Sequence, residues 1–296
     1  ACSLRLIFTS GQLSLAHGGL MAVGAYVAAL LVIELGFSSW IALVLAGVVA
    51  AGLALAVGYP FMRLRGVYFV MVTAFLSEAI SLVITEAKSV TGGAAGIINI
   101  PRPDAIVIPG LLTLDFSSPV DYYYLLLVMG LVCLAVIYAL ERSRIGFTWS
   151  SIAQAEQLAE SLGVPTIRLK VRAFFVGSFF AGLVGGFYAQ YITAITPTGF
   201  GFSYTIGVLL YMMVGGGARF AGPIIGAFIL TLLPELVRPL KEYQPFVFSA
   251  VLMLVVLFMP EGLVGLPDRI RKLARERFGY AGNKGVDQVF RGTTGG

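Results

Sequence analysis

The chain has 296 residues, of which 58% are hydrophobic and only 12% are charged, and this composition excludes an ordinary soluble protein. Its apolar runs repeatedly reach the ~20 residues that a helix needs to cross a bilayer, and they lack the ~10-residue alternation of outer-membrane strands. The net charge of +5 does not indicate a nucleic-acid partner, because lysine and arginine in a membrane protein mark its cytoplasmic loops. The sequence therefore predicts an all-α, polytopic membrane bundle.

Eight membrane-spanning helices are expected, although the sixth is short for a span. They cover residues 12–35, 39–60, 66–87, 119–140, 172–193, 203–217, 220–237 and 245–260. The predicted permease domain is residues 1–266, and residues 267–296 form a basic tail that we expect to lie along the inner membrane surface.

Lysine and arginine gather in three segments, which therefore belong on the cytoplasmic side. They are Arg63 and Arg65 after the second span, Arg142, Arg144, Arg168, Lys170 and Arg172 around the central loop, and Arg269, Arg271, Lys272, Arg275 and Arg277 after the last span. This orientation places the polar loop 141–172 in the cytoplasm.

A short amphipathic helix is predicted within that loop, over residues 150–163. Ser150 or Ser151 can cap its start, and Gly163 ends it. Its apolar positions at the spacing of one helical face are Ile152, Ala155, Ala159 and Leu162. Such a helix either lies on lipid or on its own bundle, or it docks into a groove on a soluble partner.

Six motifs, in order and covering nearly all of residues 8–267, resemble one family. They are "GQLSLAHGGLMAVGAYVAALL" from Gly11, "LRGVYFVMVTAFLSEAISLV" from Leu64, "TGGAAG" from Thr91, "AESLGV" from Ala159, "VGGGARFAGPIIGAFILTLLPEL" from Val214 and "FMPEGLVGL" from Phe258. Together they resemble the LivM-type permeases of branched-chain amino acid ABC importers. In that family a further span normally precedes the first motif, so we expect one to be missing here.

The resemblance implies both a function and a set of partners. The segment "AESLGV" is similar to the cytoplasmic signature through which such permeases contact their ATPases, which implies a coupling role for Ala159, Glu160, Leu162 and Gly163. The implied partners are a second homologous permease, two cytoplasmic ATPases and an external substrate-binding protein, with the chain itself in the inner membrane of a bacterium or archaeon. Branched-chain or other small amino acids are the implied substrates, and urea or short amides are the alternative.

The expected translocation path is read from polar residues within the spans. Gln12, Ser14 and His17 lie among glycines in an apolar run, which predicts a broken helix facing protein or a watery cavity. Glu78 is a carboxylate within a span, and such groups mark ion or substrate paths. For all four residues the alternative is structural hydrogen bonding between helices, and for Glu78 we favour it.

Missing features separate the remaining function classes. The sequence contains no phosphate-cradling loop, so energy must come from another subunit. A secondary transporter usually keeps several buried ionisable groups, and here Glu78 is essentially alone, although this class stays an alternative. A single histidine without a cluster of cysteines or carboxylates predicts no metal site, no catalytic residue and no bound cofactor, and hence no enzyme.

Overall fold

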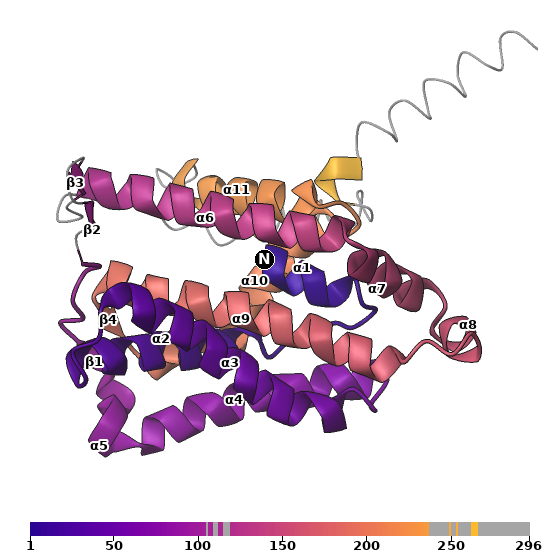
Figure 1. The fold of residues 1–296 in the computed structure, drawn as a ribbon, viewed down its shortest axis with the longest axis horizontal. Helices are drawn as coiled ribbons and strands as arrows, with labels where there is room; N and C mark the ends of the chain where they lie inside the picture. The colour runs from indigo at the N-terminus through magenta and orange to yellow at the C-terminus, as the bar shows by residue number, and fades with distance from the viewer. Residues whose placement is uncertain are drawn as a thin grey trace, which may run out of the picture. The chain divides into compact units, whose positions relative to one another are not determined.

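The computed structural model describes residues 1–104, 106–108, 112–114, 119–236 and 262–265, together with residues 249 and 253. Within this part the chain consists almost wholly of helices, as Figure 1 shows. It divides into two compact units, Ala1–Leu209 and Leu210–Gly296. The predicted all-α fold is confirmed.

The long helices of the first unit are α2 (His17–Ile33), α3 (Ser39–Phe61), α4 (Val67–Glu86), α6 (Pro119–Arg142) and α9 (Thr166–Ile192). Its shorter elements are α1 (Cys2–Phe8), α5 (Lys88–Thr91), η1 (Gly93–Ala95), α7 (Arg144–Gln154), α8 (Glu156–Ser161) and η2 (Pro197–Phe200). Helix α10 (Phe202–Gly215) crosses the boundary between the units, and α11 (Ala221–Leu236) and η4 (Leu263–Gly265) belong to the second.

Among the described residues, four short strands form two antiparallel pairs at the predicted outer side. Strand β1 (Ile97–Ile98) pairs with β4 (Ala194–Ile195), and β2 (Ile106–Ile108) pairs with β3 (Leu112–Leu114). In the first unit, β1 and β4 lie at the end opposite α7 and α8 (Figure 1). The two loop regions that the sequence places on opposite sides of the membrane are therefore at opposite ends of the bundle.

Five helical segments of the described residues are long and apolar enough to span a membrane, and α2 and α11 are shorter apolar helices. The first seven predicted spans each correspond to a helix, whereas 245–260 and the tail 267–296 lie outside the described residues. The predicted boundary of the first span is wrong, because the helix begins at His17 and not at residue 12. The five preceding residues are not helical, which confirms a broken helix near the N-terminus.

Helix α9 packs along both α2 and α3, and glycines set the distance between them (Figure 1). A Cβ atom built on Gly24 of α2 would lie 2.0 Å from the carbonyl oxygen of Gly182. One built on Gly186 would lie 2.8 Å from the Cβ of Ala28. Such small residues let helix backbones approach closely where no hydrophobic effect drives their association.

Helix α6 is fastened near its two ends. Near its start, the hydroxyl of Tyr122 donates to the carbonyl oxygen of Phe187 on α9 at 3.3 Å, and its ring stacks on Tyr191. At its end, Glu141 forms an ion pair with Arg5 of α1, and both side chains are largely buried. This pair fixes the point where the chain leaves α6 for the polar loop 141–172, the predicted coupling loop.

The second unit is built on a close approach between the end of α10 and the start of α11. A Cβ atom on Gly226 would lie 2.0 Å from the carbonyl oxygen of Tyr211, and one on Gly222 would lie 1.8 Å from that of Gly216. These positions therefore require glycine. The motif "VGGGARFAGPIIGAF" thus serves helix packing.

Candidate functional site

The loop between α6 and α9 contains two helices and not the single helix predicted over residues 150–163. Its first helix, α7, begins at Arg144 and is capped by Ser143, whose hydroxyl accepts from the Gly146 amide at 3.4 Å. The predicted caps Ser150 and Ser151 are wrong, because both lie inside α7. Ser143 is an equally good capping residue in the sequence, but the two adjacent serines at 150 and 151 were chosen in its place.

The two helices meet at Ala155, whose backbone leaves helical geometry with φ −153° and ψ 75°. Helix α8 then runs to Ser161, and Gly163 follows with φ +80°, a left-handed conformation that glycine adopts without strain. The amide of Val164 donates to the carbonyl oxygen of Ala159 at 3.1 Å, which completes the helix end. The predicted stop at Gly163 is thus confirmed.

The kink turns the predicted apolar face into a groove of about 340 Å³ between α7 and α8. Its lining residues are Phe147, Thr148, Ser151, Ile152, Ala155, Leu158, Ala159, Leu162 and Val164. Ile152 and Ala159 are buried, whereas Leu158 and Leu162 are 61% and 76% exposed. The loop therefore presents a concave apolar surface with an exposed rim.

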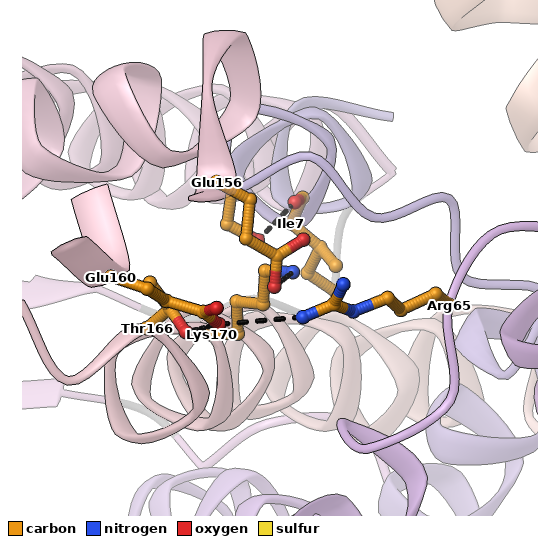
Figure 2. A network of polar contacts seen from close by, with 7 residues as sticks. Ile7, Arg65, Glu156, Glu160, Thr166 and Lys170 are labelled. Carbon is orange, nitrogen blue, oxygen red and sulfur yellow. Dashed lines mark hydrogen bonds and ion pairs between the residues drawn. The ribbon is translucent and has the colours of Figure 1, made fainter. Parts of the chain in front are cut away.

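A polar network holds α8 against the bundle, as Figure 2 shows. Lys170 of α9 is buried, and its Nζ lies 2.6 Å from Glu156 Oε1 at the start of α8. The hydroxyl of Thr166 donates to Glu160 Oε1 at 2.9 Å, and Arg65 lies 3.5 Å from the same oxygen. The Arg65 contact is exposed and contributes little, so Lys170 and Thr166 supply most of the attachment.

The four predicted coupling residues thus occupy different positions on the loop. Ala159 lies in the groove floor, and Leu162 lies on its exposed rim. Glu160 is predicted as a polar contact for a partner, and the structure already engages it with Thr166. Gly163 has open space around the place where a Cβ would stand, so its left-handed angle is its main constraint.

Trp149 anchors α7 to α9. Its side chain is buried, and its indole Nε1 donates to the carbonyl oxygen of Leu169 at 2.9 Å. A Cβ atom on Gly146 would lie 2.1 Å from the carbonyl oxygen of Glu141, so the turn into α7 admits only glycine. Both ends of the loop are therefore fixed to the bundle, while the groove between them stays open.

The second part of the site is the break before α2. Residues 12–16 are not helical, so the first amides of α2 lack partners within their own helix. Hydroxyls from other helices accept from them: Thr205 from Gly18 at 2.8 Å and Ser77 from Gly19 at 2.9 Å. Thr73 accepts from the Leu15 amide at 3.0 Å. The break is thus satisfied by protein groups, as a non-helical backbone inside a membrane requires.

The predicted path residues Gln12, Ser14 and His17 are all buried at this break. The Ser14 hydroxyl accepts from the Ala16 amide at 3.2 Å, and His17 Nε2 lies 2.8 Å from the Ser3 hydroxyl. The contacts of Ser14 and His17 agree with structural hydrogen bonding, and a role for all three side chains in translocation stays a prediction.

Glu78 is exposed on α4, unlike those three buried residues. Its Oε2 is 3.9 Å from where a Cβ of Gly201 would stand, immediately before α10 begins. The start of a helix carries partial positive charge, which favours a nearby carboxylate. Glu78 therefore lies close to the start of α10, and both its structural role and any part in translocation stay predictions.

Comparison with known proteins assigns the chain to a family. Residues 1–260 match the family profile described as branched-chain amino acid transport system / permease component. The chain belongs to this permease family. It is 32% identical over 279 residues to the high-affinity branched-chain amino acid transport system permease protein LivM of Salmonella typhimurium, covering 86% of this chain and 64% of that protein.

Further relatives extend the same family. LivM of Escherichia coli K12 is 32% identical over 276 residues, with 86% of this chain and 64% of the relative covered. LivH of Salmonella typhimurium is 26% identical over 272 residues and is covered over 87% of both chains. The chain spans 64% of the length of these two LivM proteins, and no solved structure matches it. As a member of the permease family with five long apolar helical segments among its described residues, it is a multi-pass inner-membrane protein.

Several residues of the site of this permease were missed by sequence reasoning. Thr73 and Ser77 stand four residues apart in α4, a spacing that places both hydroxyls on one face and could have indicated a shared target. Thr205 and Lys170 gave no such signal. Among the described residues, no group of three histidine, cysteine or acidic side chains is placed to hold a metal ion.

Proposed function

We propose that this chain is the membrane-spanning subunit of an ABC importer for branched-chain or other small amino acids. The observation that carries the proposal is the apolar groove between α7 and α8, which lies on the loop with the family's signature and leaves its rim exposed. An apolar surface of this kind on a cytoplasmic loop favours docking of a soluble subunit. Two ATPases, a second permease and an external binding protein complete the proposed complex, and the chain itself binds no cofactor.

The proposed mechanism is alternating access driven from the loop. Closure of the ATPases on ATP binding moves α7 and α8, which are fixed to α9 through Trp149 and Lys170. Movement of α9 displaces α2, because the two helices are in contact at Gly24 and Gly182. Packed helices of this kind shift as units between discrete arrangements, which opens the path to the other side.

The test is reconstitution of the complete complex in liposomes with the binding protein outside and ATP inside. Radiolabelled leucine should accumulate only with hydrolysable ATP, and dissipating ion gradients with an ionophore should leave the uptake unchanged. Uptake that follows the ion gradient and ignores ATP would establish the secondary transporter instead. ATP-driven accumulation of urea without leucine would keep the importer and replace its substrate.

A further inference from the structure

The bend between α1 and the non-helical residues 12–16 lies directly against the coupling loop. Gly11 occupies this bend with φ +83°, and a Cβ built on it would lie 3.0 Å from the Cα of Ala153 in α7. The two positions are far apart in the sequence, because four predicted spans lie between them. The contact is backbone against backbone, so a shift of α7 must move the bend or separate from it.

The bend is continuous with the break that precedes α2. Only residues 12–16 separate Gly11 from His17, and their backbone leads to the amides that Thr73, Thr205 and Ser77 hold. If the segment shifts, a backbone amide bonded to a side-chain hydroxyl can find another acceptor. Bending a continuous helix at the same place would instead break a turn of its backbone hydrogen bonds. A small displacement can therefore rearrange this segment without breaking a helix.

The bend and the loop also share a support. Arg5 of α1 pairs with Glu141 in the last turn of α6, shortly before α7, and both side chains are largely buried. Between α1 and the bend, the hydroxyl of Ser10 donates to the carbonyl oxygen of Ile7 at 2.7 Å and tightens the turn. The ion pair and the Gly11 contact therefore tie the N-terminal segment to the loop region at two points.

We propose that Gly11 is a positioning residue that transmits movement of the coupling loop to the discontinuous segment 12–16. This inference rests on the proposed function, because it requires that α7 moves when ATPases close. It is distinct from docking, since Gly11 does not line the groove. Gly11 acts through α7 and its own backbone, and it need not contact the transported solute.

The first test is Gly11→Ala in the complete reconstituted complex, with Gly36→Ala as its control. Both glycines have left-handed backbones, with φ +83° and +61°, but Gly36 has no atom within 4 Å of its Cβ position. The Gly11→Ala complex should still co-purify with its ATPases. Its uptake per ATP hydrolysed should fall roughly threefold or more, because the added Cβ displaces the bend from α7 in a close-packed contact. Gly36→Ala should keep the wild-type ratio.

Either of two results overturns the inference while leaving the proposed function intact. One is a wild-type ratio in Gly11→Ala. The other is an equal fall in both variants, which would assign the effect to backbone strain alone. Failure of the wild-type complex to import any solute with ATP is a separate result, because it would remove the proposed function itself.

A second test uses a reversible bond between the two positions. The pair Gly11→Cys and Ala153→Cys is introduced after replacing Cys2 and Cys133, the two cysteines of the chain. The two Cβ atoms would lie 3.4 Å apart, close to the ~3.5–4.5 Å of disulfides. If the bend and α7 move together, oxidised and reduced complexes should transport equally, both at the lowered level expected for a side chain at Gly11. Uptake that stops on oxidation and returns on reduction would show that they separate during the cycle, which overturns the inference.

Discussion

The two helix interruptions of this permease have opposite surroundings. At Ala155 the chain breaks in a polar loop, and the break leaves an apolar groove with an exposed rim. Before His17 it breaks among membrane helices, and hydroxyls of Thr205 and Ser77 accept from the freed amides. The comparison shows what each environment demands. In the aqueous phase water can satisfy an open break, whereas inside a bilayer only protein or enclosed water can.

A charge in the groove should produce the largest effect. Ala159→Asp places a carboxylate in the buried floor of the groove, where an apolar contact of the ATPase must otherwise form. ATPase binding should weaken by roughly thirtyfold or more, as for a hot-spot residue, and uptake should be lost. Binding is measured by titration of the detergent-solubilised permease. Ser161→Asp, on the exposed side of α8, should bind normally, and similar weakening in both variants would contradict the groove as the docking surface.

A substitution at the buried break before α2 should lower the stability of the permease and leave ATPase binding unchanged. Thr205→Val keeps the shape of the side chain and leaves the Gly18 amide without its acceptor, which should cost about 1–3 kcal/mol. A lower thermal unfolding midpoint in detergent would show this. Thr85→Val is the matched control, because its hydroxyl donates only to the Ser81 carbonyl of its own helix. Equal midpoints for both variants would mean that the break needs no hydroxyl.

The end of α8 allows a smaller and more selective change. Gly163→Val should cost about 1 kcal/mol or more, because a branched side chain resists a left-handed backbone. Gly163→Asn should cost less, since asparagine tolerates that conformation. ATPase affinity should fall in the same order. The open space around Gly163 means that the side chain itself meets no atom of this chain, so equal effects of valine and asparagine would argue for obstruction of the partner instead.

These results also show what one sequence can predict. The apolar runs predicted the helices, and Gly163 predicted where α8 ends, because these signals are local. The kink at Ala155 was not predicted, since alanine favours a continuous helix. Arg5 and Glu141 stand 136 positions apart, and nothing in a single sequence connects such distant residues. The acceptor Thr205, 187 positions from Gly18, was missed for the same reason.

Glu78→Gln should have the smallest effect. The substitution keeps the shape and hydrogen-bonding capacity beside the start of α10 and removes the charge. Uptake by the reconstituted complex should stay within about twofold of the wild-type value, as for substitutions outside critical contacts. A loss of uptake with normal assembly would instead assign Glu78 to proton relay or substrate passage.

Photo-crosslinking from the rim of the groove tests the central claim, that ATPases dock on α7 and α8, most directly. A photoreactive amino acid at Leu162, which is 76% exposed, should capture the ATPase subunit in membranes that contain the whole complex. The same amino acid at Leu35, which is 62% exposed in the predicted outer loop between α2 and α3, should not. An ATPase captured from Leu162 alone is the result that the account predicts, and capture from neither position, or equally from both, would contradict it.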